Sequence, residues 1–406
     1  MNVSVDTMTR MGFPPKSNGN IGWNLLENRS MIDFLKLPSP CYVLDETLLD
    51  HNLEVIDRVR RESGAEIIVA LKACAMWSIF PELARHSDGA TASSAAEARL
   101  VYEEYGRPAH TYAPVYTDEN IEEILRYSDH ITFNSVAQYE RFGQQALIRG
   151  ISCGLRVNPR YSPVETALYN PCVAGSRLGI VPEQLRELPA GIEGLHFHVL
   201  CESRPEHLRL ALEALERNFG QLLPQLKWLN MGGGHLMTHA EYDCDELIAI
   251  LRDFHARYPH LRLILEPGSA FTWRTGYLVS TVEDIVENGG VRTAMLNVSF
   301  ACHMPDCLEM PYKPAILGAH EPAEGEARWR MGGNSCLAGD YYGDWAFDHE
   351  LKVGERIVFE DMIHYTMIKT TMFNGVAHPA IAIARRDGRL DVIRRFGYED
   401  FKNRMS

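Results

Sequence analysis

Residues 66–75 read Glu-Ile-Ile-Val-Ala-Leu-Lys-Ala-Cys-Ala, so that Lys72 stands at the end of an apolar run. Such a run is typical of a strand covered on both faces, where an ammonium is costly unless it is paired or chemically used. A lysine at the mouth of a strand can extend its four-carbon stem to water. A desolvated amine can instead be a nucleophile that forms a Schiff base with a carbonyl group. The stretch alone leaves both explanations open.

A carboxylate, Glu266, closes a second apolar run, residues 263–265. A carboxylate in such a place needs a cationic partner or a protonated nitrogen. One explanation is a structural salt bridge. The other is a site for pyridoxal phosphate (PLP), in which the carboxylate keeps the pyridine nitrogen protonated so that the ring accepts electrons from a bond broken at the substrate's α-carbon.

Three consecutive glycines, Gly232, Gly233 and Gly234, end a third strand-like run. Without a Cβ, their backbone amides can approach a phosphate closely, and amide dipoles favour an anion. A tight turn is the simpler explanation of a glycine triplet. Phosphate binding therefore depends on the other residues of the site.

Two histidines, His196 and His198, flank Phe197 near the end of a fourth run. Because side chains alternate along a strand, both imidazoles point to the same face. This spacing suits a metal pair, a buried structural histidine, or an imidazole stacked on a cofactor ring. No obvious cluster of Asp, Glu or His completes a metal site, so we expect the stacked ring and no metal.

A thiol, Cys336, lies between glycines in the loop formed by residues 332–340. A lone cysteine is usually a small, inert hydrophobic residue. In such a loop it can also donate a proton, which a decarboxylation requires to quench the carbanion that it forms.

The composition excludes several classes of protein. The chain has 406 residues, 46% hydrophobic and 23% charged, which is enough for a large core and two domains. Its nine cysteines form no C-x-x-C pair, and its formal net charge of −14 argues against a nucleic-acid partner. No apolar stretch reaches eighteen residues, and the N-terminus lacks the apolar core of a secretory signal, so we expect a cytoplasmic protein without a membrane partner.

Strand-like runs alternate with amphipathic stretches from about residue 48 to 290, which is typical of a parallel (β/α)8 barrel. In such barrels the active site gathers at the carboxyl ends of the strands. We expect helices at residues 118–127 and 205–219. The eight predicted strands are residues 66–73, 89–94, 110–114, 130–135, 152–158, 194–199, 228–234 and 262–268.

Beyond residue 290, short β-like runs such as residues 356–359 and 390–393 are separated by Gly, Pro and Asp. The predicted fold is therefore α/β: a (β/α)8 TIM barrel followed by a C-terminal antiparallel β domain. The family resemblance described below implies that the first domain binds PLP and that the second is a β-barrel. The predicted domains are a flexible extension (1–36), a strand contributed to the β domain (37–47), the barrel (48–290) and the β domain (291–406).

Taken together and in this order, these residues and several longer motifs resemble the alanine-racemase-like, fold type III PLP decarboxylases, which include ornithine and diaminopimelate decarboxylases. The resemblance runs from about residue 38 to 406 and is greatest to the carboxynorspermidine/carboxyspermidine decarboxylases. The motifs are residues 70–73 (ALKA), 89–94 (GATASS), 194–198 (GLHFH), 302–306 (CHMPD) and 359–366 (FEDMIHYT).

The resemblance implies a role for each cofactor-binding residue. Lys72 would carry PLP as a Schiff base, and His198 would stack on the ring. Residues Gly232 to Gly234 would hold the phosphate, which Tyr365 would also contact. Glu266 would pair with the pyridine nitrogen.

The resemblance also implies a homodimer with composite active sites, in which Cys336 comes from the partner subunit as proton donor. Asp306 and Asp340 would meet the amines of a polyamine precursor, and Arg177 is a candidate for a carboxylate contact. Glu202 is a further candidate carboxylate for a long cationic substrate. The implied reaction removes the α-carboxylate of carboxynorspermidine or carboxyspermidine in polyamine biosynthesis.

Two departures from the family pattern leave the substrate and the activity open. The family usually has an acidic residue where this chain has Ser269, and tends to have Asp where it has Asn297. The substrate could be another basic amino acid, such as diaminopimelate, arginine or ornithine. The chain could also be a metal-dependent barrel hydrolase that uses His196 and His198, or an inactive homologue that retains PLP.

Overall fold

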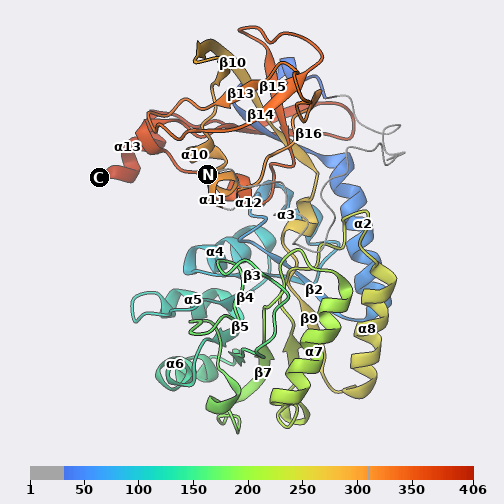
Figure 1. Cartoon of the computed structure of the whole chain (residues 1–406). Coiled ribbons are helices and arrows are strands. Elements are labelled where there is room, and N and C mark those ends of the chain that lie inside the picture. Colours follow the sequence, from blue (N-terminus) through green and yellow to red (C-terminus); the bar gives the residue numbers. More distant parts are fainter. Residues whose placement is uncertain (1–31, 310) are drawn as a thin grey trace. The chain divides into compact units, whose positions relative to one another are not determined.

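The computed structural model describes residues 32–309 and 311–406 (Figure 1). By the density of internal contacts these residues divide into two units. The barrel unit contains Asn52–Phe271, and the sheet unit contains Thr272–Ser406 together with the segment that ends at His51. The predicted flexible extension, residues 1–36, lies almost wholly outside the described residues.

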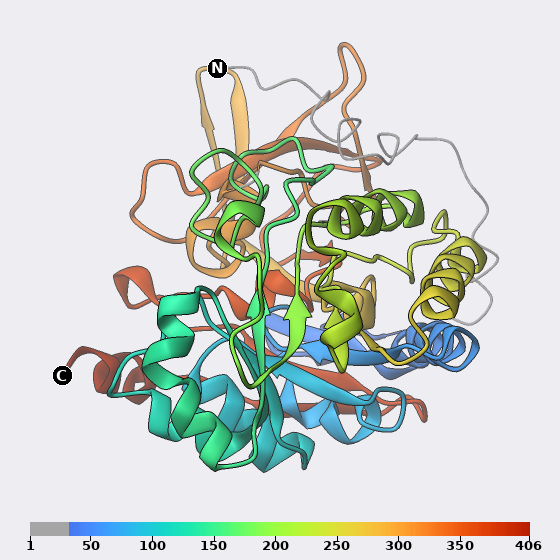
Figure 2. The same cartoon turned by 90° about the horizontal axis from the view of Figure 1, so that it is seen from below.

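Eight parallel strands of the barrel unit form a closed barrel in the order in which they occur along the chain. All eight predicted strands are present, and the (β/α)8 barrel is confirmed. Parallel neighbours require crossover connections, and helices on the outside of the barrel provide most of them (Figure 2). The connection from β6 to β7 is instead a long loop with one short 3-10 helix, Pro182–Gln184. The strands are β2 (Glu66–Ala70), β3 (Gly89–Ala92), β4 (Ala109–Tyr112), β5 (Ser128–Phe133), β6 (Ser152–Arg156), β7 (Ile192–His196), β8 (Trp228–Asn230) and β9 (Arg262–Leu265).

Several helices of this unit begin at a side chain that caps the first turn. The hydroxyls of Ser94 and Ser135 and the carboxylate of Asp243 accept the amide three residues further on, which satisfies a donor that the helix leaves open. The helices are α2 (Glu46–Ser63), which begins in the sheet unit, α3 (Phe80–Leu83), α4 (Ala95–Leu100), α5 (Ile121–Tyr127), α6 (Val136–Ile148), α7 (Pro205–Phe219), α8 (Cys244–Arg257) and α9 (Ser269–Thr272).

Inside the barrel, one tryptophan occupies the space of two missing side chains. A Cβ at Gly154 would lie 2.2 Å from the ring of Trp228, and a Cβ at Gly194 would lie 2.0 Å from it. The indole Nε1 of Trp228 donates to Ser152 Oγ at 2.9 Å. Two adjacent strands, β6 and β7, therefore need glycine at these positions for β8 to place its tryptophan.

The sheet unit is a nine-stranded mixed sheet rather than a purely antiparallel barrel. Strand β1 runs parallel to β16, and β11 runs parallel to β13. The whole barrel unit lies between β1 and β16 in the sequence, which provides the long connection that a parallel pair requires. The strands are β1 (Cys41–Asp45), β10 (Gly276–Asn288), β11 (Val291–Leu296), β12 (Ala319–His320), β13 (Trp329–Gly332), β14 (Tyr341–Phe347), β15 (Arg356–Glu360), β16 (Ala380–Ala384) and β17 (Leu390–Arg394).

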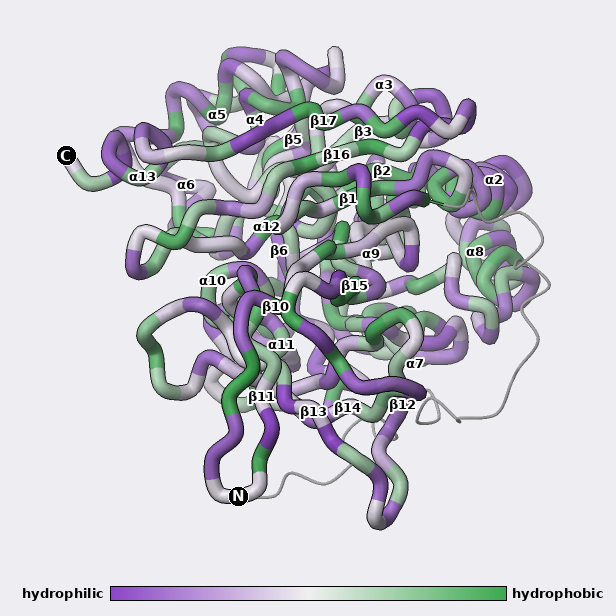
Figure 3. Tube along the Cα trace, turned by 90° about the horizontal axis from the view of Figure 1, so that it is seen from above, coloured by the Kyte–Doolittle hydropathy of each residue, from purple (hydrophilic) through white to green (hydrophobic). Residues whose placement is uncertain are grey.

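The predicted end of the barrel at residue 290 is corrected to Phe271. Strand β10 pairs with β1, β11 and β15, so it belongs to the mixed sheet. Its first half is buried, whereas its outer half is mostly exposed and contains both hydrophilic and hydrophobic residues (Figure 3). The buried half has the same apolar character as a barrel strand, which is why the sequence did not mark the boundary.

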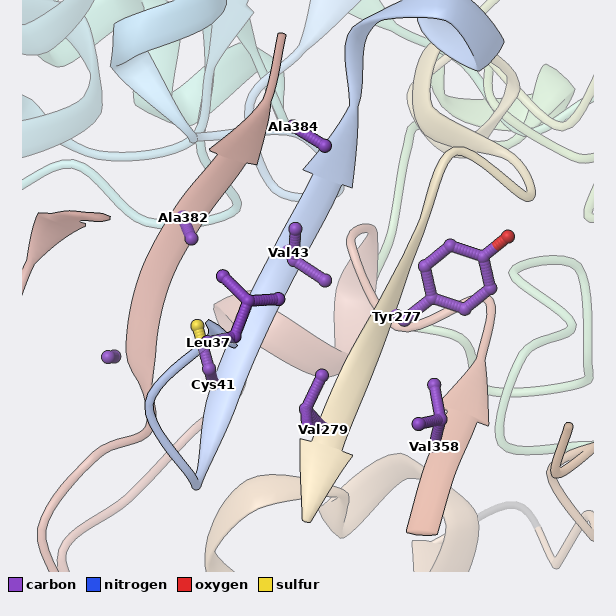
Figure 4. Packing of buried hydrophobic residues seen from close by; sticks show 9 residues of the cluster. Leu37, Cys41, Val43, Tyr277, Val279, Val358, Ala382 and Ala384 are labelled. Carbon is purple, nitrogen blue, oxygen red and sulfur yellow. The ribbon is translucent and has the colours of Figure 1, made fainter. Parts of the chain in front are cut away.

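Side chains from four strands form a core on one face of this sheet (Figure 4). Val43 of β1 lies between Ala382 of β16 and Tyr277 of β10. In the next row, Val279 of β10 lies between Cys41 of β1 and Val358 of β15. The short helices of the unit are α10 (Phe300–His303), α11 (Pro305–Glu309), α12 (Tyr365–Ile368) and α13 (Tyr398–Met405).

Candidate active site

Lys72 lies in the turn that follows β2, at the carboxyl end of the barrel, and is open to a pocket. Its Nζ lies 3.4 Å from Nε2 of His198. Nδ1 of the same imidazole accepts the amide of Gly233 at 2.9 Å. In a neutral imidazole only one nitrogen carries a proton, so this contact assigns the proton to Nε2, the atom that faces Lys72.

The pKa values of both bases at this contact are shifted downward, toward the neutral form. The pKa of Lys72 is lowered, because the surrounding protein desolvates its ammonium and Arg156 repels it, although Glu266 acts in the opposite direction. Desolvation also places the pKa of His198 well below its ordinary value, and the charges of Lys72 and Arg156 add to this. A lysine in this state is a better nucleophile than an ordinary one.

Glu266 follows β9 and is ionised in spite of its burial. Desolvation alone would raise the pKa of its carboxyl, but His196, the side-chain amide of Asn230 and the charge of Lys72 together lower it to about 2. Nδ2 of Asn230 donates to Oε1 of Glu266 at 2.6 Å. The pocket therefore contains a fixed negative charge.

His196 is 2% exposed, and its ring lies 5.2 Å from that of Tyr112. Its Nε2 lies 3.5 Å from Oε2 of Glu266, too far for a strong hydrogen bond, and both ring nitrogens otherwise lack a partner among the described residues. Desolvation lowers the pKa of His196. In the described part of the chain, His196 and His198 do not form a three-donor metal group with any Asp, Glu, Cys or His.

The glycine segment is fixed by close contacts on each side. Gly232 and Gly234 have φ of +70° and +97°, and a Cβ at Gly233 would lie 2.3 Å from the carbonyl oxygen of Glu266. The amide of Gly232 donates to Oδ1 of Asn230, and the amide of Gly233 donates to His198. Two of the three amides are therefore engaged within the protein, which leaves Gly234 as the candidate donor for a phosphate in this segment.

Arg156 and Tyr112 also line the pocket, and neither was among the predicted site residues. Arg156 is 5% exposed, its Nη2 donates to the carbonyl of His198 at 3.2 Å, and its guanidinium lies 4.6 Å from the centre of the Tyr112 ring. Each is the last residue of a barrel strand: Arg156 ends β6, and Tyr112 ends β4. Their position at the strand end, which drew attention to Lys72, was the signal that could have identified them.

Arg177 and Glu202 lie in loops of the barrel unit. The backbone carbonyl of Arg177 accepts a hydrogen bond from Nδ2 of Asn134, and Oδ1 of Asn134 accepts one from the amide of Gly179. The side chain of Arg177 is exposed. Glu202 has a left-handed backbone with φ of +44°. Their contacts with a substrate stay predictions.

The Cys336 loop belongs to the sheet unit, and a buried carboxylate organises it. Asp340 is 5% exposed; its Oδ1 accepts the amide of Ala301 and its Oδ2 accepts the amide of Ser335, each at 2.9 Å. The amide of Cys336 donates to Oδ1 of Asn374 at 2.9 Å, and the side chain of Cys336 is exposed. One oxygen of Asp340 is thus engaged by the loop itself and the other by helix α10, which favours a positioning role over the predicted substrate contact.

Asp306, also in the sheet unit, has one carboxylate oxygen that is hydrogen-bonded and one that is buried without a hydrogen-bond partner among the described residues. Its Oδ2 accepts the hydroxyls of Tyr312 and Thr366 at 2.8 and 2.7 Å. Its Oδ1 is buried without a hydrogen-bond partner among the described residues. Such an oxygen suits the predicted contact with a substrate amine. Tyr365 begins α12, and its predicted phosphate contact stays a prediction.

The two departures from the family pattern have different surroundings. Asn297 accepts the amide of Thr281 at 3.0 Å and donates to Oε1 of Glu283 and Oγ of Ser39 at 3.1 Å. It is therefore a structural residue of the sheet unit. Ser269 begins α9 directly after the Glu266-Pro267-Gly268 turn.

A nucleophilic lysine, an ionised carboxylate and a glycine cradle at the carboxyl end of a (β/α)8 barrel define the class of PLP-dependent enzymes with this fold. Residues 41–363 match the family model described as pyridoxal-dependent decarboxylase, C-terminal sheet domain. The chain belongs to this family and is a PLP-dependent carboxy-lyase, as predicted. Family membership sets aside the metal-dependent hydrolase.

Curated relatives span nearly the full chain. The chain is 52% identical over 383 residues to carboxyaminopropylagmatine decarboxylase of Synechocystis sp., with 94% of this chain and 98% of the relative covered. It is 39% identical to carboxynorspermidine/carboxyspermidine decarboxylase of Campylobacter jejuni, over 91% of this chain and 99% of the relative. The resemblance stated from the motifs is confirmed.

Solved structures agree with the fold. Carboxynorspermidine decarboxylase from Campylobacter jejuni, complexed with norspermidine, matches with a TM-score of 0.85 and 38% identity, over 91% of this chain and 100% of that chain. Diaminopimelate decarboxylase from Helicobacter pylori has a TM-score of 0.77 at 19% identity, with 91% and 97% of the chains covered, and shares the fold.

Proposed function

We propose that this enzyme removes the α-carboxylate of carboxynorspermidine or carboxyspermidine, and so releases CO2 with norspermidine or spermidine. The observation that carries the proposal is the pocket of Lys72, His198 and Glu266 in a chain whose relatives decarboxylate carboxylated polyamines. Oδ1 of Asp306, which is buried without a hydrogen-bond partner among the described residues, supports recognition of a substrate amine.

Carboxyaminopropylagmatine is the second candidate substrate. The specific observation in its favour is the 52% identity to a decarboxylase of that name. Agmatine compounds end in a guanidinium where the other two substrates end in an ammonium. A planar guanidinium donates to a carboxylate in bidentate geometry, whereas an ammonium is a compact point charge, so one site rarely serves both equally.

The residues in the pocket fit PLP. The glycine cradle has no room for a Cβ, the carboxylate of Glu266 is ionised, and the buried nitrogens of His196 lack a close partner. When bound, PLP supplies a carbonyl group for an amine and a ring that accepts the electron pair released as CO2 leaves. Lys72 would hold the cofactor through its amine, and Glu266 would hold the proton of the ring nitrogen.

The remaining groups position these two residues. His198, fixed by the Gly233 amide, would orient the amine of Lys72 and cover the ring. Arg156 adds a positive charge beside His198 and Tyr112. The thiol of Cys336, in the loop that Asp340 organises, would deliver a proton to the α-carbon of the substrate.

We propose a homodimer in which Cys336 of one subunit completes the site of the other. The sequence resemblance supports this proposal. A mixture of Lys72→Ala and Cys336→Ala subunits tests it, because random exchange makes half of the dimers mixed, each with one intact site. The mixture should recover about a quarter of the wild-type rate; no recovery after subunit exchange would place Cys336 and Lys72 of one chain in the same site.

We also propose that the enzyme works in the cytoplasm. All nine cysteines are free, which suits a reducing compartment. Among the described residues, no helix is both long and apolar enough to cross a bilayer.

The experiment compares the purified wild-type protein with Lys72→Ala. Both are supplied with PLP, and the visible absorption of the bound cofactor and the release of CO2 are recorded. We expect a visible absorption band of the bound cofactor that depends on Lys72. We also expect the wild type to release CO2 from carboxynorspermidine, carboxyspermidine or carboxyaminopropylagmatine. Relative kcat/KM then assigns the substrate. Preference for diaminopimelate, arginine or ornithine would overturn the polyamine proposal, and a band without CO2 from any of these would support an inactive homologue.

A further inference from the structure

Two histidines and an aspartate meet near the amino ends of β4 and β5, at the end of the barrel opposite Lys72. His110 is the second residue of β4, and Asp129 and His130 are the second and third residues of β5. The Lys72 pocket lies at the carboxyl ends of the strands and includes Tyr112, the last residue of β4. The three residues therefore form a cluster separate from the active site.

A β-bulge assembles this cluster. Ala109 pairs with Ser128, but the next residue of β4, His110, pairs with His130, so Asp129 is the extra residue on β5. A bulge re-aims the side chain of the inserted residue. In this case His110 and His130 are paired neighbours whose rings stack at 3.9 Å, and the carboxylate of Asp129 reaches both.

The donor atoms have the spacing of metal ligands. Oδ1 of Asp129 lies 2.8 Å from Nδ1 of His130 and 3.8 Å from Nε2 of His110. One donor atom from each of the three residues lies within 4.8 Å of the other two. Two ligands of a tetrahedral ion with bonds near 2.1 Å are about 3.4 Å apart, a value between the two separations.

The surroundings allow a cation to enter and remain. The side chain of Asp129 is 49% exposed, whereas those of His110 and His130 are each 13% exposed, so the cluster is reachable from solvent through the carboxylate. Nearby Arg262 is engaged by both carboxylate oxygens of Glu66, at 2.7 and 2.8 Å. Its positive charge is therefore balanced.

From this geometry we propose that His110, Asp129 and His130 bind a divalent transition metal of the zinc class. Two imidazoles and one carboxylate are a donor set that Zn²⁺ accepts, and a water molecule would complete four-coordination. Because the ligands come from two adjacent strands, the ion would join β4 to β5 and stabilise the amino end of the barrel. The site takes no part in the decarboxylation.

The test measures zinc binding and thermal unfolding of the full-length, tag-free holoenzyme. Protein freed of metal with a chelator is titrated with ZnCl2, and the bound zinc is counted by elemental analysis. We expect about one ion per chain and a higher Tm with zinc. Asp129→Asn keeps the shape and an oxygen acceptor but loses the charge, so zinc affinity should fall at least tenfold, and His130→Gln should lose binding.

The matched control is His51→Gln, which removes an exposed histidine of α2 and should bind zinc as the wild type does. Circular dichroism establishes that each variant is folded, and the near-isosteric Asp129→Asn keeps the test valid should His130→Gln misfold. Equal zinc affinity in Asp129→Asn and the wild type, or no stoichiometric zinc in the wild type, overturns the proposal. In that case the cluster is a hydrogen-bonded structural group.

Discussion

Nε2 of His198 faces Nζ of Lys72 at 3.4 Å, while the amide of Gly233 occupies the other nitrogen of the ring. Since the imidazole proton lies on Nε2, an attractive contact requires a lone pair on the amine of Lys72. The lowered pKa of Lys72 agrees with that requirement. Gly233, in the glycine segment after β8, therefore fixes the His198 ring that faces the amine of Lys72 after β2.

Replacement of His198 by alanine should weaken both cofactor binding and turnover. The change removes the ring beside Lys72 and leaves the Gly233 amide without its acceptor. We expect kcat to fall on the order of 100-fold, with weaker binding of PLP. Absorbance titration of the PLP-free enzyme and CO2 release measure the two effects. His255→Ala, on the remote helix α8, is the control; wild-type PLP affinity in His198→Ala would contradict the role.

Replacement of Glu266 by glutamine tests the fixed charge of the pocket. Glutamine can still accept the amide of Asn230, but it removes the negative charge that His196 and Lys72 face. We expect a folded protein with kcat lowered on the order of 10²–10³-fold, because the charge can no longer stabilise a protonated cofactor nitrogen. Glu97→Gln, which removes another carboxylate close to Lys72, should cost far less. Equal losses in the two variants would assign Glu266 a general electrostatic role only.

Replacement of Asp340 by alanine should disorder the loop that presents Cys336. It removes the acceptors for the amides of Ala301 and Ser335. Asn374→Ala removes the acceptor for the amide of Cys336 by a different route. We expect both to lower kcat with a smaller effect on KM, since the loop positions a proton donor. A rise in KM with unchanged kcat would instead favour the predicted substrate contact of Asp340.

The sequence predicted the barrel because each strand is an apolar run that ends in a turn signal, and this pattern is local. The boundary at Phe271 and the parallel pair of β1 with β16 depend on partners far apart in the chain, which no local pattern encodes. The sheet was predicted as antiparallel for this reason.

In the site, the sequence identified residues whose chemistry is conspicuous at a strand end, such as Lys72 and Glu266. It missed Arg156, because an arginine at a strand end is ordinarily assigned to solvent, and only the structure shows it buried against Tyr112. It also assigned all three glycine amides to a phosphate. Two of them are used by Asn230 and His198, a tertiary arrangement that the sequence does not contain.

Replacement of Gly194 by alanine should destabilise the barrel. Its Cβ would lie 2.0 Å from the Trp228 ring, which is held by Ser152 and has little room to move. We expect a loss of about 1–3 kcal/mol in the free energy of unfolding. Gly89→Ala is the matched control, because its Cβ would lie an ordinary 3.4 Å from Ile68. Urea unfolding measures both; equal midpoints for the two variants would show that Trp228 can be displaced at no cost.

Two buried histidines predict how stability depends on pH. Desolvation lowers the pKa of His235 in the barrel unit to about 4, and desolvation together with His378 lowers that of His303 in the sheet unit to about 4. Both are neutral in the folded protein, whereas in the unfolded chain they take up a proton below pH 6.5. The unfolded state therefore binds more protons between pH 6.5 and 4, so stability must fall as the pH falls through this range.

Replacement of His235 by glutamine should make that pH dependence shallower. The shift from 6.5 to about 4 corresponds to about 3 kcal/mol for one fully buried group. Glu266, whose pKa is lowered to about 2, loses its contribution only between pH 4.5 and 2, so the two windows barely overlap. Urea midpoints from pH 7.5 to 4.5 measure the slope, and His51→Gln is the exposed control. A slope in His235→Gln equal to that of the wild type would mean that His235 does not stay neutral in the folded barrel.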